Sequence, residues 1–548
     1  MPGGSPANSN AKLQACLREV DTAFRKNDMP AAMRLSHQAI GAGLEHPRLL
    51  VFAAYHELRE GSPDQALQLA TRARALSPRD VDVLNAVGNC LARLERFREA
   101  VKMFDAALRE APGAYLVRHN KASALQSLQE LTRARVEFER VIEAQPNHVE
   151  GLTSLADLAM QRGDVDAARN YAERALRVDP LHDAAGLELV RADIEHREFE
   201  TALKRLSRIV QRNTLGAKQL SIAQGLAGDA YDGLGRLSDA VRSYSQSRAT
   251  QRSAHKAQLE DRESAAALVA RLTAYFRNAP QDAWHISADG VETDPVETHA
   301  FLVGFPRSGT TLLEQILAGH PDVEVLSERS CLVDAQKSFT IPPDGIGRLA
   351  GLKSLELAPF RAAYWSRVAE EGASPRRRVF VDKMPFYCVF LPLVAKLFPR
   401  AKIIFALRDP RDVVLSCFRR RFVMTEQIYE LTTLETTAGH YDAVMNLCSL
   451  YREKLGLNFY DVRHENLVTD MEGETRRLCE FLGIAWNAGM ARIAETAQRR
   501  PINTPNGPQL AHGLSSKGVG QWRRYGEYLA PVLPKLAPWV ERFGYPDQ

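Results

Sequence analysis

The 548-residue sequence predicts an all-helical repeat array followed by an α/β domain built on a parallel sheet. Prolines recur every 34 residues in the first half, at Pro78, Pro112, Pro146 and Pro180. In the second half, short apolar runs alternate with helical patterns, as expected for strands buried on both faces of a parallel sheet. One run, ending at Gly304, leads through a turn of small residues into a helical pattern.

The repeat of the first half also shows in its small residues. Alanines keep the 34-residue step, at Ala66, Ala100, Ala134, Ala168 and Ala202. The small residues Gly88, Ala122 and Ala156 lie twelve positions before Ala100, Ala134 and Ala168. Two helices that cross closely need a small side chain each, and a proline ends the second helix. This period is typical of tetratricopeptide repeats. We expect six or seven repeats between residues 12 and 250, with an insertion near 213–219; a helical bundle without true repeats is the alternative.

A tetratricopeptide array forms a solenoid with a concave groove, and such grooves commonly bind peptides. We expect this groove to recruit a peptide or protein partner, and the alternative is a supporting role only. Residues 251–295 are expected to form a capping helix and a linker rich in Asp, Pro and Gly.

Residues 296–548 are expected to form the α/β domain. Apolar runs predict strands, which are 300–305, 378–381, 402–407 and 457–462. In parallel sheets ligands bind beyond the carboxyl ends of the strands. The residues that follow each strand are therefore the candidates for function.

The loop after the first strand, Pro306-Arg-Ser-Gly-Thr-Thr311, has the layout of a phosphate cradle. Backbone N–H groups of the loop and of the following helix converge on an anion, and the helix dipole adds about half a positive charge. Gly304 and Gly309 keep the glycine spacing of the ATP-binding loop G-x-x-x-x-G-K-[ST], but Thr310 replaces the lysine. Arg307 supplies the cation instead, which disfavours an ATP or GTP site.

A second anion motif follows the strand at 402–407. Arg408 stands at the end of this strand, and Ser416 and Arg420 lie four residues apart on the expected helix, so they should share a helical face. Guanidinium groups match phosphate oxygens in pairs. The segment could therefore grip one phosphate, and the alternative is a helix cap with ion pairs.

In this order, the two motifs resemble the 5′-phosphosulfate loop and the 3′-phosphate motif of sulfotransferases that use 3′-phosphoadenosine 5′-phosphosulfate (PAPS), and most of all the protein-tyrosine sulfotransferases. The resemblance implies that the P-loop-like segment binds the 5′ end of PAPS, through Arg307, Ser308, Gly309, Thr310 and Thr311. It assigns the 3′-phosphate to Arg408, Ser416 and Arg420, with Lys517 of the Lys517-Gly-Val-Gly-Gln-Trp522 run as a further partner on a closing loop.

The resemblance also implies catalytic residues. Glu328 matches the base that takes the acceptor's proton, a role worth about 10²- to 10⁴-fold in rate, and Glu324 is its rival. Lys383, after another strand, and Arg307 match groups that stabilise the charge developing during transfer. No metal is expected, because cationic side chains take the part that Mg²⁺ has in ATP-binding relatives. His464 stands where the family often has an adenosine-site tyrosine, and Asn506 lies near a serine position that supports the transition state.

The sequence therefore predicts a tetratricopeptide-containing sulfotransferase that moves a sulfuryl group from PAPS to a hydroxyl. Protein tyrosine is the leading acceptor, and glycans and small alcohols stay open. Two alternatives remain: an interaction scaffold with an inactive nucleotide-binding domain, and a P-loop kinase.

Composition sets further limits. A net charge of +4 gives no case for nucleic-acid binding. The seven cysteines are scattered and never spaced C-x-x-C, which indicates free thiols in a reducing compartment. Residues 1–10 lack the pattern of a signal peptide, and no apolar run approaches the roughly 18 residues of a membrane helix. We therefore expect a cytoplasmic protein without a membrane span. The sequence does not predict its oligomeric state.

Overall fold

The computed structural model describes residues 6–260, 262–284, 294–373, 377–499 and 513–546. Its contacts divide the chain into two units. The first comprises Met1–Ala159 and Asp166–Glu188, and the second comprises Met160–Val165 and Leu189–Gln548. Each unit is described by itself.

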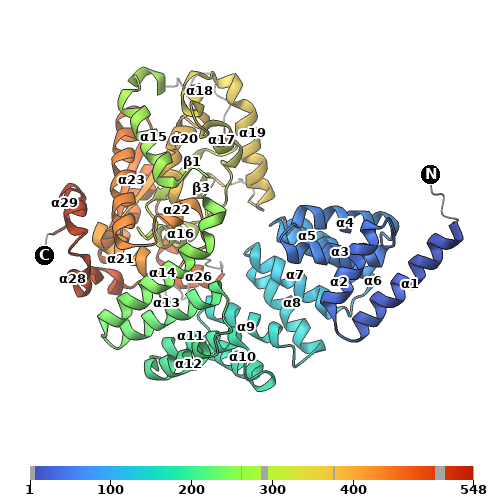
Figure 1. Ribbon diagram of the computed structural model, residues 1–548. Coiled ribbons are helices and arrows are strands. Elements are labelled where there is room, and N and C mark those ends of the chain that lie inside the picture. The colour runs from blue at the N-terminus through green and yellow to red at the C-terminus, as the bar shows by residue number, and fades with distance from the viewer. Residues whose placement is uncertain (1–5, 261, 285–293, 374–376, 500–512, 547–548) are drawn as a thin grey trace. The chain divides into compact units, whose positions relative to one another are not determined.

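The helices of the repeat region follow one another with short connections, which favour antiparallel neighbours (Figure 1). They are α1 (Pro6–Arg25), α2 (Met29–Gly41), α3 (Pro47–Glu60), α4 (Pro63–Leu76), α5 (Val81–Arg93), α6 (Phe97–Glu110), α7 (Tyr115–Ser127), α8 (Leu131–Ala144), α9 (Val149–Gln161), α10 (Val165–Val178), α11 (Asp183–Glu195), α12 (Phe199–Gln211), α13 (Ala217–Gly233) and α14 (Leu237–Leu259). The periodic prolines each stand just after the second helix of a pair, as predicted.

The periodic small residues lie where helices approach most closely. Ala66, Ala100 and Ala134 are fully buried. A Cβ atom on Gly88 would come within 2.4 Å of the Phe104 ring, so α5 and α6 could not pack as they do with any larger residue there. The predicted insertion extends a helix, because α13 has 17 residues where α11 has 13.

The second unit continues from the last repeats into the sheet domain. Its remaining elements are α15 (Ala265–Asn278), η1 (Gln281–Trp284), β1 (Thr298–Gly304), α16 (Thr310–Ala318), β2 (Val323–Ser327), α17 (Val333–Phe339), α18 (Gly345–Gly351), α19 (Ser354–Glu370), β3 (Val379–Lys383), η2 (Pro385–Phe390), α20 (Leu391–Leu397), β4 (Lys402–Leu407), α21 (Pro410–Arg419), α22 (Glu426–Tyr429), α23 (Leu434–Lys454), β5 (Asn458–Arg463), α24 (His464–Thr469), α25 (Met471–Leu482), η3 (Ala488–Ala491), α26 (Ile493–Arg499), η4 (Ser516–Gly518), η5 (Gln521–Tyr525), α28 (Gly526–Leu529) and α29 (Leu533–Arg542), where η denotes a 3₁₀ helix.

The five strands form one parallel sheet in the order β2-β3-β1-β4-β5. The four predicted strands are present. Strand β2, an edge strand of five residues that pairs with β3, was not predicted. The chain leaves β1 toward one side of the sheet for β2 and returns past it for β4. This topological switch beside β1 is where ligands bind in such sheets.

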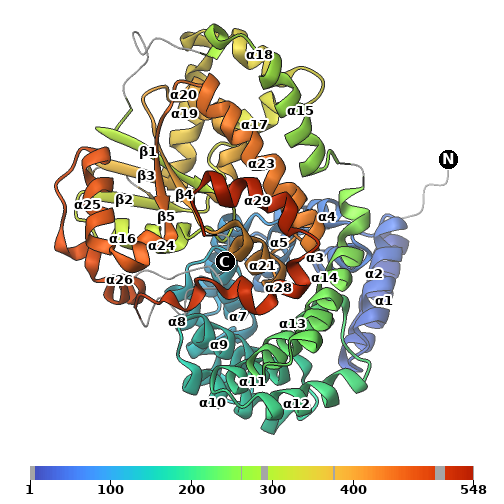
Figure 2. The same cartoon turned by 90° about the vertical axis from the view of Figure 1, so that its left-hand side faces the viewer.

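Helices cover both faces of the sheet, which gives three layers (Figure 2). On β1, Ala300 and Leu302 face the core that includes α16 and α25, whereas Phe301 and Val303 face the core that includes α15, α20 and α23. All four side chains are fully buried, as the continuous apolar run predicted.

Helices α14 and α15 belong to the core of the sheet domain. Tyr244 of α14 and Val269, Leu272 and Phe276 of α15 lie in the same buried cluster as Phe301. Helix α15 therefore packs with the last repeat helix and with the sheet, and its role as a cap of the solenoid stays a proposal. The predicted domain limits of 12–250, 251–295 and 296–548 stay a proposal.

Arg248 of α14 holds the carboxyl end of α21. Its Nε and Nη2 atoms each donate a hydrogen bond of 3.0 Å, to the carbonyl oxygens of Phe418 and Cys417. A cation at this end of a helix satisfies free carbonyls and complements the helix dipole. The side chain is buried, and burial lowers the pKa of Arg248.

Replacing Arg248 with methionine should therefore lower the free energy of unfolding by about 2–3 kcal/mol, because two buried carbonyls lose a charged donor. Urea denaturation of the full chain measures this. Arg242→Met is the matched control, since that side chain lies on the same helix with 66% of its surface exposed and its loss should change stability by less than about 0.5 kcal/mol. Equal effects of both changes would contradict the assigned role.

All seven cysteines are free thiols, as predicted. Among the residues that the structure describes, none of the helices combines the length and the apolar character that crossing a bilayer requires.

Candidate active site

The loop between β1 and α16 has backbone geometry that suits an anion cradle. Arg307 and Gly309 adopt left-handed conformations, with φ of 73° and 99°. Gly309 is the N-cap of α16, and a Cβ atom there would lie 2.9 Å from Nδ1 of His464. Ser308 and Thr310 are buried, and Thr311 is partly exposed. The structure thus turns the loop sharply onto the first turn of α16, whose N–H groups are free of helical partners.

Gly304 ends β1 for a steric reason. Its φ is 152°, and a Cβ atom would lie 2.6 Å from the carbonyl oxygen of Ala406 on the neighbouring strand. Only glycine lets the loop leave the sheet beside β4. The cradle is therefore held directly against the end of β4 and its Arg408.

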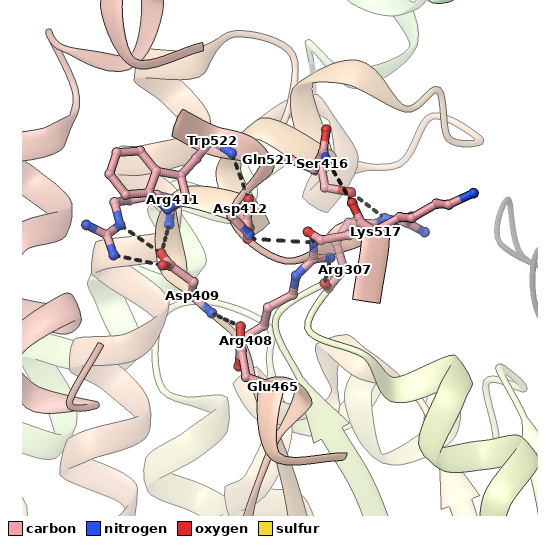
Figure 3. Close-up of polar contacts among 12 residues, drawn as sticks. Arg307, Arg408, Asp409, Arg411, Asp412, Ser416, Glu465, Lys517, Gln521 and Trp522 are labelled. Carbon is pink, nitrogen blue, oxygen red and sulfur yellow. Dashed lines mark hydrogen bonds and ion pairs between the residues drawn. The ribbon is translucent and has the colours of Figure 1, made fainter. Parts of the chain in front are cut away.

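Three guanidinium groups gather at the ends of β1 and β4. Nε of Arg307 donates to Oγ of Ser416 at 3.0 Å, and Nη1 of Arg408 donates to the carbonyl oxygen of Arg307 at 3.2 Å (Figure 3). Burial, and then the like charges of Arg420 and Arg408, lower the pKa of Arg307. Positive charge is concentrated here, and an anion bound among these groups would relieve their repulsion.

Arg420 lies at the end of the helix that carries Ser416, and their shared face stays a prediction. Helix α21 ends at Arg419, and Arg420 is its C-cap with extended backbone dihedral angles of −97° and 134°. Its N–H donates to the carbonyl oxygen of Ser416 at 3.2 Å, which closes the last turn. Ser416 joins the cluster because Arg307 reaches across to it, and Arg420 acts on Arg307 through its charge.

The segment from Ser516 to Tyr525 docks on the start of α21. Nη2 of Arg408 donates to the carbonyl oxygen of Gly518 at 2.5 Å. The buried carboxylate of Asp412 accepts from the N–H groups of Gly520 and Trp522 at 2.7 and 2.9 Å. Trp522 also stacks under Arg411, whose Cζ is 3.9 Å from the ring centroid. The predicted closing loop is thus fastened beside the guanidinium cluster.

Lys517 lies on this segment but turns outward. Its carbonyl oxygen accepts from Nε2 of Gln521 at 2.7 Å, while its side chain is exposed and points away from Arg408 in Figure 3. The structure does not bring its ammonium group to the cluster. Its part in binding a 3′-phosphate stays a prediction.

Lys383 and Glu328, expected as catalytic residues, form an ion pair. Nζ of Lys383 lies 2.6 Å from Oε1 of Glu328 and 2.9 Å from Oε2 of Glu314. Lys383 is fully buried, whereas the Glu328 side chain is 43% exposed. Burial, the largest influence, opposes the charge of Lys383, but the two carboxylates outweigh it and raise its pKa. Lys383 therefore stays charged in the interior.

Backbone geometry fixes this pair. Ser327, the last residue of β2, is paired in register with Lys383 at the end of β3. Glu328 follows with φ of 50°, and its N–H donates to the carbonyl oxygen of Lys383 at 2.7 Å. The left-handed turn keeps the Glu328 side chain at the edge of the sheet beside the lysine.

Glu314 is a third member of this group that was not predicted from the sequence. It lies on α16, is buried, and accepts a hydrogen bond from Oγ of Ser327 at 3.0 Å as well as the contact from Lys383. One signal was available: Glu314 is a carboxylate within the apolar pattern Leu312, Leu313, Ile316, and a buried charge needs a partner.

A second buried network lies on the other face of β3. Oδ2 of Asp382 accepts from the hydroxyl of Tyr364 at 2.9 Å, and that hydroxyl also contacts Nε2 of His299 at 3.0 Å. Burial raises the pKa of Asp382 to about 7, against smaller opposing effects of Tyr364 and Lys383.

This network predicts a pH-dependent loss of stability. Between its unfolded value of 3.8 and about 7, Asp382 is ionised in the unfolded chain and protonated in the fold, so stability falls as pH rises through this window. Asp382→Asn cannot ionise. The free energy of unfolding of this variant, relative to that of the wild type, should therefore rise by about 3 kcal/mol between pH 5 and pH 8. Urea unfolding at both values measures the gap, and a constant gap would contradict the prediction.

Two buried polar atoms beside the cradle lack a hydrogen-bond partner among the described residues. They are Nδ1 of His464 and Nε of Arg408. Burial, followed by the charges of Arg408 and Arg307, lowers the pKa of His464 to about 3, so its imidazole is neutral. Asn506 falls outside the described residues.

Comparison with known proteins finds matches for both parts of the chain. Residues 300–488 match the model of the sulfotransferase family, and residues 57–116, 88–149 and 159–217 match models of the tetratricopeptide repeat. The chain carries a sulfotransferase domain and tetratricopeptide repeats. The family match begins on β1 and ends after α25, so it covers the cradle, Glu328, Lys383 and Arg408.

The relatives of the sulfotransferase domain are distant. A protein-tyrosine sulfotransferase of Drosophila melanogaster is 26% identical over 253 residues, 44% of this chain and 46% of the relative. Protein-tyrosine sulfotransferase A of Caenorhabditis elegans is 28% identical over 263 residues, 45% and 66% of the two chains. An uncharacterised Aquifex aeolicus protein is 27% identical over 270 residues, which are 46% of this chain and 34% of the relative.

The chain thus spans between 34% and 66% of the length of these relatives. Among solved structures, a tetratricopeptide repeat protein of Thermus thermophilus aligns with 33% of this chain and 98% of its own length, at 19% identity and a TM-score of 0.30.

Proposed function

We propose that the sulfotransferase domain moves a sulfuryl group from PAPS to a hydroxyl acceptor. The observation that carries the proposal is the joint placement of two features at one sheet edge. Arg307, Arg408 and Arg420 gather at the ends of β1 and β4, and the Glu328–Lys383 pair stands at the end of the adjacent β3. An anion-binding cluster and a base–cation pair are what sulfuryl transfer requires.

The residues fit a nucleotide with phosphates at both ends. The 5′ cradle would be residues 307–311, and Arg408, Ser416 and Arg420 would hold the 3′-phosphate. Support comes from the unpartnered atoms of Arg408 and His464 and from the like charges gathered around Arg307. When bound, PAPS supplies the sulfuryl group and a phosphate leaving group.

Glu328 is assigned as the general base. Its carboxylate is partly exposed and can accept the acceptor's proton as the acceptor oxygen bonds to sulfur. The bond from sulfur to the bridging phosphate oxygen breaks, which leaves adenosine 3′,5′-bisphosphate and a sulfate ester. Lys383 donates a hydrogen bond toward the negative charge on the departing phosphate, with Arg307 beside it. Glu314 keeps Lys383 paired once Glu328 is protonated.

We propose protein tyrosine as the acceptor and the tetratricopeptide repeats as the element that recruits it. Support comes from the relatives named protein-tyrosine sulfotransferases. Tetratricopeptide repeats also commonly bind peptides in their concave groove. Free and mostly buried cysteines are typical of reducing compartments, so we propose a cytoplasmic location.

The test is a transfer assay with labelled PAPS, the full chain, and a panel of tyrosine peptides, sugars and small alcohols in the presence of EDTA. Label should enter the tyrosine peptides. EDTA should not prevent this, because the proposed chemistry uses side-chain cations in place of Mg²⁺. Labelling of sugars alone would change the acceptor class. Failure to label any acceptor, with Mg²⁺-dependent turnover of ATP instead, would overturn the proposal in favour of a kinase.

Removing residues 1–182 tests the role of the repeats, and the cut keeps α11 and all that follows it. The KM for a long peptide acceptor should rise at least about tenfold, because a second attachment point raises the effective concentration of the substrate. The KM for a small phenol should stay constant and serves as the control. Equal KM values for the peptide in both proteins would make the repeats a support only.

A further inference from the structure

The first unit holds a cluster of metal-ligating side chains that sulfuryl transfer does not use. His37 lies on α2, and His56 and Glu57 lie on α3. One ligand atom from each lies within 4.8 Å of the other two. No other group of three such side chains gathers this closely among the residues that the structure describes.

The two members on α3 have surroundings that suit a bound cation. The Glu57 side chain is only 11% exposed, and a buried carboxylate needs a positive partner. Nδ1 of His56 is buried and lacks a hydrogen-bond partner among the described residues. His37 lies between them: its Nε2 is 2.8 Å from Oε1 of Glu57, and its ring stacks on that of His56 with centroids 4.6 Å apart. A divalent cation here would place a positive charge beside the Glu57 carboxylate.

We propose that His37, His56 and Glu57 bind a divalent transition-metal ion of the zinc class. Two imidazoles and one carboxylate form a borderline donor set that Zn²⁺ accepts in tetrahedral sites, with water as a fourth ligand. Oxygen-seeking ions such as Mg²⁺ and Ca²⁺ would find one carboxylate here, which is too few.

The geometry needs only side-chain adjustment. Metal–ligand bonds of 2.0–2.2 Å in a tetrahedron place ligand atoms about 3.4 Å apart. The ligand atoms, which now lie within 4.8 Å of one another, would therefore have to approach by at most about 1.4 Å. The His37 side chain is 47% exposed, so it can rotate and lets an ion enter from solvent. A bound ion would tie α2 to α3 and stiffen the terminal repeats, which have neighbours on one side only.

Calorimetry on the full chain tests the site, after removal of metals with EDTA and of the chelator by dialysis. Titration with ZnCl₂ should show one ion per chain and a rise in the melting temperature of the repeats. His37→Gln is the decisive variant, since a glutamine amide can still donate to Glu57 but is a poor metal ligand. It should weaken binding at least about tenfold, and His56→Gln should do the same.

His46→Asn is the matched control. His46 is the N-cap of α3, where its Nδ1 accepts from the N–H of Arg48 at 3.2 Å, and asparagine caps helices well. This variant loses an imidazole from the same helix and should bind Zn²⁺ as the wild type does. Circular dichroism confirms that each variant is folded. Zn²⁺ binding that is absent in the wild type, or unchanged in both cluster variants, or equally weakened by His46→Asn, would overturn the proposal.

Discussion

Replacing Glu328 with glutamine is expected to lower kcat by about 10²- to 10⁴-fold, because an amide cannot accept the acceptor's proton. Glutamine keeps the size of the side chain and can still accept a hydrogen bond from Lys383, so the geometry of the pair is retained. Glu314 still pairs with Lys383 in this variant, so the free energy of unfolding should fall less than it does in Lys383→Met. Steady-state kinetics with labelled PAPS measures kcat.

Two comparisons separate general-base catalysis from a structural effect. Acceptor phenols of lower pKa should lose less rate in Glu328→Gln, since they need less help to lose the proton. Glu324→Gln, on the same short strand β2, should keep kcat within about threefold. A Glu328→Gln enzyme with wild-type kcat, or a larger loss in Glu324→Gln, would contradict the assignment of the base.

Replacing Lys383 with methionine is the second change with a large expected effect. It should lower kcat by about 10²- to 10³-fold, the usual loss when one preorganised donor to developing charge is removed. It should also lower the free energy of unfolding by about 3–5 kcal/mol, because Glu314 is left as an unpaired buried charge. Kinetics and urea denaturation of one preparation measure both.

The double variant Glu314→Gln/Lys383→Met separates the two effects. Removing the buried carboxylate as well should restore most of the lost stability, while kcat stays low because the cation is still missing. Stability that does not recover would show that Glu314 is not the group left unpaired. Activity that recovers with stability would show that Lys383 has no catalytic role.

The cradle could be predicted from sequence because its determinants are local. A strand, two glycines at fixed spacing and a helix follow one another between Phe301 and Leu317, and no distant contact is needed to place them. The same holds for the repeats, whose neighbouring helices are also neighbours in sequence. Local sequence patterns were therefore sufficient to predict the cradle and the repeats.

The pairing of Glu328 with Lys383 depends on strand order, which local patterns do not contain. The two residues are 55 positions apart and meet because β2 lies beside β3 in register. Resemblance to a known family named both residues, but the contact and the third member Glu314 required the fold. Strand β2 was not predicted, so Glu328 was not expected at the end of a strand.

The end of helix α21 and the packing of α15 also have long-range causes. Helix α21 ends one residue before Arg420, at the place where Arg248 of α14 binds its last carbonyls. Helix α15 has an apolar face that could pack on the end of a solenoid or on a sheet. In the fold this face lies in the same buried cluster as the sheet residue Phe301. In both cases the deciding partner is far away in the sequence.

The proposed reaction requires that the guanidinium cluster at the ends of β1 and β4 binds a nucleotide with phosphates at both ends. Calorimetric titration of the folded chain with adenosine 3′,5′-bisphosphate tests it most directly. The wild type should bind one molecule, and Arg408→Ala should bind at least about 10²-fold more weakly, since a buried charged contact is lost. No binding to the folded wild type, or equal affinity in Arg408→Ala, would contradict the claim.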